Sequence, residues 1–526
     1  MKKRSKRMTE TKKTGIAKTA FWVSVISTVS LMFSFVQESV FAFFFGATAF
    51  TDAYAVAIQI PVSLFSIIST AITNIVIPCY SKELYRKDKE SAKRYASNFM
   101  TMIGIITIAL IILGEIFAKY LVIAFAPGMS LAAKECATIV FRLVLPTVLL
   151  TELMNINIGI LNVHKSFILP ALTSNLLNIS FVTTVAILQG KYGIYAAAIG
   201  MVIGSVIEFL YTELLRRKYF KYQFVVDTHD ESMKQSLKMA IPIFVGIGAT
   251  EINKMIDKII ASFLGSGNIS MLNYASKLSS ALSSLLVTGI MTVIYPEFAK
   301  NAANEDDQKN ADIFVRTINI FLIIILPVIA GIAVLGEEAI KIVYGRGAFT
   351  MEMVKKTSPL FFCYVVCLLF TIFRQISSRV FYSHGDSKTP MKNSMIGIGV
   401  NIVLNVVLGM LLGALGLALA TTIATMVISM LLFKDIKIRN PYIEYKSSLK
   451  VAGKCLIGCF VMAIVLVLSK WIAIKYLNYE LSSMLSVVLF SIVTVLIGAI
   501  VYLIVLILVK TEEVKKVTSK ILRRRR

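Results

Sequence analysis

Apolar runs of about 20 residues, separated by short polar segments, recur from residue 20 to residue 509. A helix of about 20 apolar residues crosses the hydrocarbon core of a bilayer, which is ~30 Å thick. The pattern therefore predicts an all-α polytopic membrane protein with fourteen membrane-spanning helices. The predicted spans are 20–46, 52–80, 95–118, 132–162, 166–188, 192–216, 237–264, 270–297, 311–335, 355–383, 389–411, 413–433, 448–473 and 483–509.

The composition supports this interpretation, and the distribution of charge predicts how the chain is oriented in the membrane. The chain has 526 residues, of which 57% are hydrophobic and 16% charged, whereas soluble proteins carry about 25% charged residues. Lysine and arginine outnumber the acids 55 to 30, and they cluster in both tails and at 82–94, 216–222 and 434–440. An even number of spans puts these segments on one side, which the positive-inside rule makes cytoplasmic, facing anionic lipids. No nucleic-acid-binding module accompanies the charge, so a nucleic-acid partner is not expected.

The first twelve spans form two similar halves, offset by about 220 residues. "ESVFAFFFG" (38–46) aligns with "DKIIASFLG" (257–265), and "LNVHKSFILP" (161–170) aligns with "FYSHGDSKTP" (381–390). Both copies start on the same side of the membrane, so the repeat is parallel. Two six-helix lobes of this kind favour a transporter with a central cavity that opens alternately to each side.

This repeat also predicts the domain boundaries. They are a basic cytoplasmic tail (1–19), an N-lobe (20–226), a cytoplasmic linker (227–236), a C-lobe (237–434), two C-terminal helices (435–509) and a second basic tail (510–526).

Polar residues at membrane depth are costly, so they are candidates for function. The repeat pairs Glu38 with Asp257. Glu251 and Asn253 line the cavity or pair with Lys254.

Four segments resemble the MviN/MurJ family of lipid II flippases, in the multidrug/oligosaccharidyl-lipid/polysaccharide exporter superfamily. They are "FFGATAFTDAYAVAIQIP" (44–61), "ASFLGSGNISMLNYASKL" (261–278), "YGRGAFT" (344–350) and "RVFYSHGDSKTPMKNSMIGIGVNIVLNVVLG" (379–409). The resemblance implies a protein of the bacterial cell membrane that moves lipid II, an undecaprenyl-diphosphate-linked peptidoglycan precursor, to the outer leaflet. It also implies that the two C-terminal helices help to form a groove for the polyprenyl tail.

The chain departs from this family in its cationic residues. The family's first helix typically carries an Arg-Asp pair, which falls on Gln37 and Glu38 here. The second helix has no basic residue, and the basic position of the eighth helix falls on Lys277. The resemblance therefore leaves the diphosphate with fewer cationic partners than is usual in the family. Lys277 is the best candidate for binding this anion, with ion pairing to Glu38 or Asp257 as the alternative, and Lys254 and Arg374 are candidate substitutes for the missing arginines. The substrate-binding residues that the resemblance implies are Gln37, Glu38, Glu251, Asn253, Lys254, Lys277 and Arg374.

The resemblance also implies a sodium site. Family members can bind sodium through an acid on helix seven, an Asn/Asp pair on helix eleven and a threonine on helix twelve. The matching residues here are Asp257, Asn401, Asn405 and Thr421, with the carbonyl of Leu417 as a further ligand. Sodium entry would then drive the return of the transporter. The alternative is that these side chains hydrogen-bond between helices without an ion.

Other functions remain open at this stage. The missing arginines are compatible with a different polyprenyl-linked glycan as substrate, such as a capsule or teichoic precursor. Drug/cation antiport occurs in the same superfamily, but with twelve rather than fourteen spans. The chain has no Walker loop, no HExxH and no soluble domain for a nucleotide-sugar, so we predict a transporter and not an enzyme. We expect a monomer without a cofactor, sodium being its only candidate ion.

Overall fold

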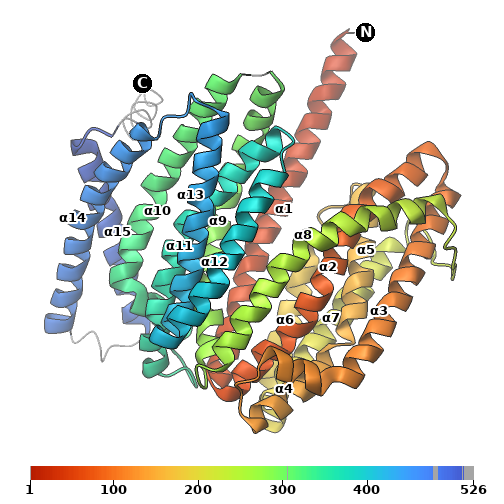
Figure 1. The fold of residues 1–526 in the computed structure, drawn as a ribbon, viewed down its shortest axis with the longest axis horizontal. Coiled ribbons are helices and arrows are strands. Elements are labelled where there is room, and N and C mark those ends of the chain that lie inside the picture. The colour runs from red at the N-terminus through yellow and green to blue at the C-terminus, as the bar shows by residue number, and fades with distance from the viewer. Residues whose placement is uncertain (1, 305, 478–483, 512, 514–526) are drawn as a thin grey trace. The chain divides into compact units, whose positions relative to one another are not determined.

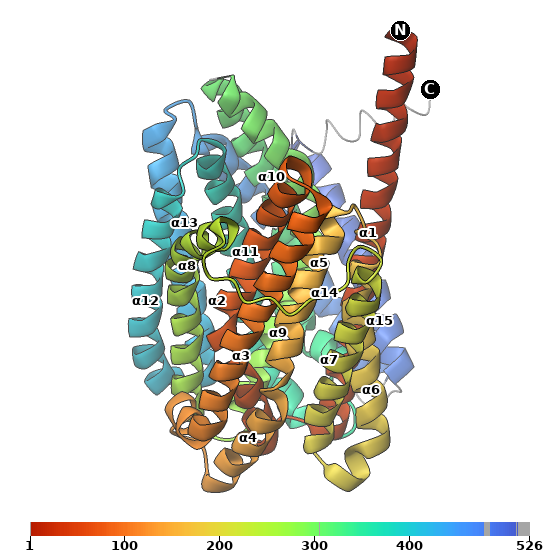
Figure 2. The ribbon, with the colours of Figure 1, turned by 90° about the vertical axis from the view of Figure 1, so that its right-hand side faces the viewer.

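The computed structural model describes residues 2–304, 306–477, 484–511 and 513, and all regular structure in these ranges is helical (Figures 1 and 2). The helices are α1 (Lys2–Phe45), α2 (Ala49–Arg86), α3 (Lys89–Phe125), α4 (Leu131–Val144), α5 (Thr147–Val163), η1 (Pro170–Leu172), α6 (Thr173–Tyr192), α7 (Tyr195–Arg216), α8 (Glu231–Ser262), α9 (Asn268–Ala303), α10 (Asp307–Val343), α11 (Met351–Ser383), α12 (Lys388–Leu412), α13 (Ala414–Arg439), α14 (Tyr445–Leu477) and α15 (Met484–Leu508).

Twelve candidate membrane spans are present among the described residues, and α4 and α5 together form one of them. Helices α8 and α9, of 32 and 36 residues, lie where the sequence predicts two more. The all-α membrane fold is thus confirmed. The count of fourteen spans is consistent with the structure and stays a prediction, as does the tail at 514–526, which lies outside the described residues.

The chain divides into two compact units, Met1–Gly267 and Asn268–Arg526. In the first unit α2 is central and packs against α3, α4, α5 and α8, while α6 packs against α7 and α1. Helix α8 belongs to this unit because α2 and α3 are its main partners. The division therefore falls one helix after the linker at 227–236, and the lobe boundaries drawn from the repeat stay predictions.

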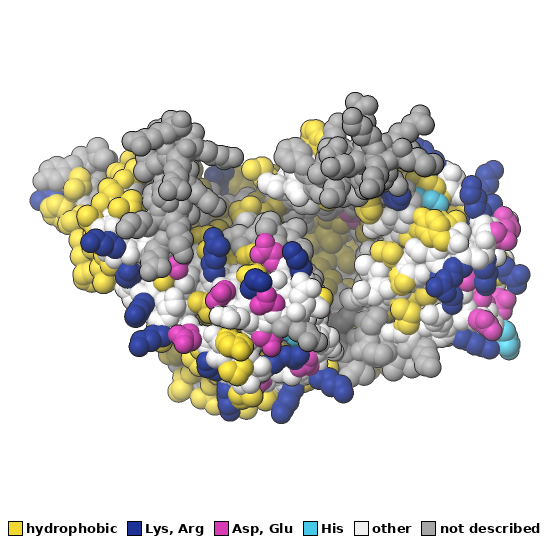
Figure 3. All heavy atoms as spheres, turned by 90° about the horizontal axis from the view of Figure 1, so that it is seen from above, with side chains coloured by type: hydrophobic (Ala, Val, Ile, Leu, Met, Phe, Trp, Pro, Cys, Tyr) yellow, Lys and Arg dark blue, Asp and Glu magenta, His cyan; other side chains and the backbone are white. Residues whose placement is uncertain are grey.

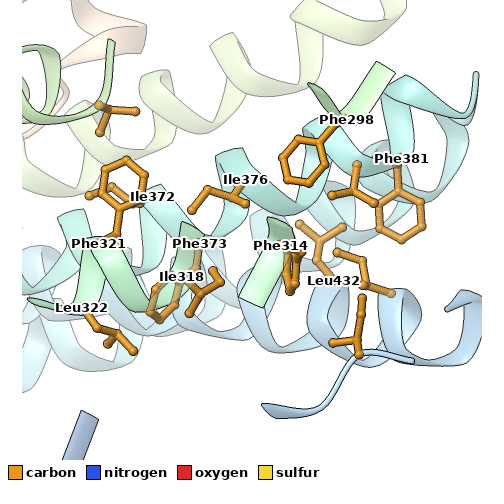
Figure 4. Close-up of a cluster of buried hydrophobic side chains, with 14 of the residues drawn as sticks. Phe298, Phe314, Ile318, Phe321, Leu322, Ile372, Phe373, Ile376, Phe381 and Leu432 are labelled. Carbon is orange, nitrogen blue, oxygen red and sulfur yellow. The ribbon is translucent and has the colours of Figure 1, made fainter. Parts of the chain in front are cut away.

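In the second unit α11 is central and packs against α9, α10 and α13. Its core is built from aromatic and branched aliphatic side chains of these helices, including Phe314, Phe321 and Ile376, which are fully buried (Figure 4). Helices α14 and α15 pack against each other and against α10. The two C-terminal helices are thus fixed to the second unit through α10.

The repeat is visible in how equivalent helices end. The C-cap residue of α5 is His164 and that of α11 is His384, 220 residues later. The next residues, Lys165 and Gly385, both have positive φ, at 63° and 75°. The amide of Lys165 donates to Asn162 O at 3.0 Å, and the amide of Gly385 donates to Tyr382 O at 3.0 Å. Both helices thus close with the same left-handed C-terminal turn.

A second pair of turns keeps the same offset. The C-cap residue of α6 is Gly193 and that of α12 is Gly413, with φ of 54° and 60°. Each glycine amide donates to the carbonyl four residues earlier: Gly193 N to Gln189 O at 2.9 Å, and Gly413 N to Gly409 O at 3.0 Å. Two turns of different geometry that keep one spacing are strong evidence for a parallel structural repeat.

The paired turns predict opposite effects of matched substitutions. Gly385→Ala should lower the free energy of unfolding by about 1 kcal/mol, because a side chain disfavours positive φ. A Cβ at Gly385 would meet nothing within 4 Å, so the cost is that of the backbone alone. Lys165→Gly should raise the free energy of unfolding by a similar amount. Thermal unfolding in detergent tests both, and shifts of the same sign would contradict the equivalence.

Candidate functional site

Gln37 and Glu38 lie on α1, which is anchored in the first unit. Both side chains are half-buried. One turn earlier, Ser34 accepts a hydrogen bond from Asn178 Nδ2 of α6 at 3.1 Å. One turn later, the ring of Phe41 lies 4.9 Å from that of Tyr54. The two candidate residues are therefore held at a defined place between polar and aromatic contacts.

The candidates on α8 show one clear ion pair. Lys254 Nζ lies 2.7 Å from Glu251 Oε1, and the Glu251 side chain is 7% exposed against 50% for Lys254. The two residues are one turn apart on the same helix, a spacing at which opposite charges attract. Asn253 and Asp257 are half-buried and take part in interactions of their own. Of the two alternatives for Glu251, the pairing with Lys254 is present.

Lys277 and Arg374 lie in the second unit on packed helices. Lys277 is exposed on α9, and Arg374 is half-buried on α11. Close to Lys277 in sequence, Ser279 Oγ donates to Tyr364 O of α11 at 2.9 Å, which fixes one helix against the other. Lys277 is not an isolated charge, because it interacts with another group of the chain.

The predicted sodium ligands fall in both units. Asn401 and Asn405 are buried on α12, and Asn405 Nδ2 donates to Asn401 Oδ1 at 2.9 Å. On α13, which packs against α12, Thr421 Oγ1 donates to Leu417 O at 3.1 Å. Four of the five residues thus lie on two adjacent helices. Asp257 belongs to the first unit, so the complete set remains a prediction.

Asp52 has a role that the sequence did not reveal. Its Oδ2 accepts a hydrogen bond from the amide of Gly267 at 2.6 Å, 215 residues away, in addition to lying in the first turn of α2. Gly267 has φ of 84°, and a Cβ there would lie 2.5 Å from Ala47 O. Asp52 therefore fixes the segment after α8 to the start of α2. The two segments lie so close together that position 267 has no room for a side chain.

The "RGAF" segment forms the connection between α10 and α11. The ring of Tyr344 lies 4.8 Å from Tyr274 of α9 and 5.9 Å from Phe349. Gly347 has φ of 58°, and Thr350 caps α11 by accepting from the amide of Met353. This motif thus builds a tight aromatic turn.

The "GDSKTP" segment caps α12. Asp386 accepts hydrogen bonds from the amides of Lys388 and Thr389, both at 3.0 Å, and from Thr389 Oγ1 at 2.8 Å. These hydrogen bonds, with Thr389 contributing most, hold the pKa of Asp386 below its usual value. Arg439 of α13 lies 3.4 Å from the same carboxylate. The segment therefore joins three helix ends.

Comparison with known proteins agrees with this fold. The family described as lipid II flippase MurJ matches residues 41–490. A probable lipid II flippase MurJ of Rickettsia prowazekii (strain Madrid E) is 27% identical over 466 residues, covering 87% of this chain and 91% of that protein. The lipid II flippase MurJ of Burkholderia cenocepacia is 25% identical over 391 residues, covering 72% of this chain and 75% of that protein.

Solved structures give the same result. The structure titled lipid II flippase MurJ, inward closed conformation, superposes with a TM-score of 0.76 at 26% identity, covering 92% of this chain and 97% of that one. An inward-facing multidrug resistance transporter of the MATE family superposes with a TM-score of 0.65 at 16% identity, covering 81% and 99%. The second likeness is one of fold alone.

The contact of Gly267 with Ala47 leads to a prediction. Gly267→Ala should lower the free energy of unfolding by more than about 2 kcal/mol, because it adds a steric clash to the cost of positive φ. Gly193→Ala is the matched control, since a Cβ there meets nothing within 4 Å. Its cost should be smaller, about 1–2 kcal/mol, because only the backbone conformation is strained there. Equal losses of thermal stability in detergent would show that the Ala47 contact is unimportant.

Proposed function

This chain belongs to the MurJ family of lipid II flippases, and we propose that it moves lipid II from the inner to the outer leaflet by alternating access. It is a transporter of the bacterial cell membrane and not an enzyme. The observation that carries this conclusion is the family match over residues 41–490, on an all-helical fold with a parallel repeat. No described feature favours a different polyprenyl-linked glycan or a drug as substrate.

Both termini are cytoplasmic in the proposed topology. The basic clusters of the two tails and of 82–94, 216–222 and 434–440 support it through the positive-inside rule. Figure 3 shows lysine and arginine side chains interspersed with acidic ones. The net charge of the chain, +25, would attract the anionic lipids of the inner leaflet.

The chemistry of the substrate explains why polar residues are needed along its path. A bare diphosphate in hydrocarbon would cost tens of kcal/mol on a Born estimate, so its charge needs water and cations during transfer. Lys277 and Arg374 would supply cations, and Gln37, Glu38 and Asn253 hydrogen-bonding groups for the sugars. An inside-negative membrane potential would favour outward movement of the anion by about 2.3 kcal/mol per charge per 100 mV.

Sodium is the proposed coupling ion. Asn401, Asn405, Thr421 and the Leu417 carbonyl offer the hard, neutral oxygen atoms that suit a hard cation, and Asp257 offers the compensating charge. The Oδ1 of Asn401 accepts one hydrogen bond and keeps a second lone pair for an ion. The Leu417 carbonyl lies inside α13 and accepts from Thr421 Oγ1 in addition to its helical hydrogen bond, so it is the weakest of the proposed ligands. The residues present therefore fit sodium. The ion would enter the cell as the empty transporter returns to its inward-facing state.

Rescue of a bacterium depleted of its own lipid II flippase tests the function. Expression of this chain should restore accessibility of lipid II at the outer leaflet. Lys277→Ala should reduce that accessibility at least tenfold, because it removes a cation from the headgroup path. Lys277→Arg should retain it.

The control for this experiment is Lys300→Ala, which removes an exposed lysine from the last turn of the same helix. Chain that reaches the membrane yet restores no accessibility would reject lipid II as the substrate. Full activity of Lys277→Ala would instead reject Lys277 as a headgroup ligand and leave the function standing.

The sodium proposal predicts a specific loss. Asp257→Asn should abolish the sodium dependence of flipping in proteoliposomes, because it removes the one charged ligand. Glu251→Gln is the matched control on α8, since Glu251 pairs locally with Lys254, and it should keep the dependence. Unchanged sodium dependence in Asp257→Asn would argue for the alternative, hydrogen bonding between helices.

A further inference from the structure

A charged pocket lies in the second unit where α10 ends, α11 begins and α14 passes its last turns. It has a volume of about 260 Å³ and is lined by Glu337, Glu338, Lys341, Met351, Lys355, Lys470 and Ile474. None of these residues belongs to the candidate substrate or sodium sets. The pocket therefore needs an explanation of its own.

A break in α10 shapes this pocket. Leu335 has non-helical φ and ψ of −108° and 17°, so the helix bends just before Glu337. A Cβ on the next residue, Gly336, would lie 2.9 Å from Ser358 Oγ of α11, so the bend lies close against that helix. The last turns of α10 are thereby directed so that Glu338 and Lys341 face the same space.

Lys470 of α14 is held at the wall of the pocket by a buried partner. Its Nζ lies 2.8 Å from Glu338 Oε1, and the Glu338 side chain is 6% exposed. The same Nζ lies 3.5 Å from Val334 O, beside the bend. This ion pair fixes α14 to α10 and places the Lys470 cation at the pocket. Removal of Glu338 would leave the charge of Lys470 without its partner, which is costly.

The charges of the pocket favour an anion. Three lysines face two glutamates, which gives a formal charge of +1, and Glu338 is already engaged by Lys470. Lys341 and Lys355 remain to bind a ligand, beside the N-terminus of α11 at Met351, which also attracts negative charge. A singly charged phosphate diester balances this set.

The surroundings of the pocket favour a lipid as the source of that phosphate. On α14 the next residue, Trp471, is 53% exposed, and Lys475 Nζ lies 4.7 Å from the centre of its ring. Exposed tryptophan and lysine mark the boundary between hydrocarbon and headgroups in membrane proteins. Ile474, 40% exposed, lines the pocket on the same side. The pocket thus opens at the depth of lipid headgroups.

We propose that this pocket binds the phosphate of an anionic phospholipid, through Lys341, Lys355 and Lys470, while the acyl chains lie along α14. At its other end, α14 contacts the segment after α15, where Lys454 Nζ donates to Lys510 O at 2.9 Å. With cytoplasmic termini, as proposed above, the phospholipid belongs to the outer leaflet. The binding itself does not depend on that topology or on the flipped substrate.

Native mass spectrometry of the purified chain with dioleoylphosphatidylglycerol tests the proposal. The double variant Lys341→Ala/Lys355→Ala should bind this lipid at least tenfold more weakly than the unchanged chain. Glu337→Gln should bind it more tightly, because it removes a negative charge without disturbing the buried ion pair. Dioleoylglycerol, which has the same chains but no phosphate, should show no difference between the variants.

Lys356→Ala is the control, since this exposed lysine adjoins Lys355 in sequence but pairs with Glu352 at 2.7 Å and does not line the pocket. Equal binding by the double variant and this control would overturn the proposal. Undecaprenyl diphosphate, measured in the same way, identifies the source of the phosphate. If the double variant weakens only that ligand, the phosphate site stands, but the phospholipid assignment is wrong.

Discussion

The hydrocarbon core of the membrane is the constraint on which this structure depends. Backbone N–H and C=O groups find no water there, so each spanning segment must satisfy them internally as a helix. Hydroxyl side chains follow the same rule: Thr421, Thr422 and Thr425 all donate to carbonyls one turn earlier on α13, at 2.8–3.1 Å. Some hydroxyls inside the spans also reach a neighbouring helix: Thr422 Oγ1 donates to Cys363 O of α11 at 3.0 Å, and Ser429 Oγ donates to Phe370 O at 2.7 Å. Polar contacts between distant parts of the chain are therefore made inside the spans as well as at helix ends.

Helix ends are where the motifs of the family act in this chain. Asp52 of the first motif holds Gly267 at the start of α2, "RGAF" builds an aromatic turn, and Asp386 binds the first amides of α12 and meets Arg439. These residues connect spans and need not touch the substrate. Recognisable family segments are therefore evidence of a shared scaffold, and a match to them does not by itself identify the headgroup ligands.

The sequence predicts the helices and the repeat because both are encoded locally, in apolar runs and in turns such as those at His164 and His384. It does not predict partners that are distant along the chain. The place of Asp52 in the first turn of α2 explains a carboxylate there, yet this carboxylate also binds an amide 215 residues away. The packing of α8 on α2 and the pairing of Lys470 with Glu338 were missed for the same reason. No local pattern records which surfaces meet.

Buried charge alone does not identify a transport site in this chain. Glu251 and Lys254 are paired within α8, and Glu213 and Arg216 within α7, so each pair moves with its own helix. A pair on one helix is satisfied in every state of an alternating-access cycle and has no need of a ligand. A residue that binds and releases a substrate must instead meet different partners in different states. By this criterion Lys254 is a weaker candidate for a headgroup ligand than Lys277, whose interactions do not include an acid one turn away on α9.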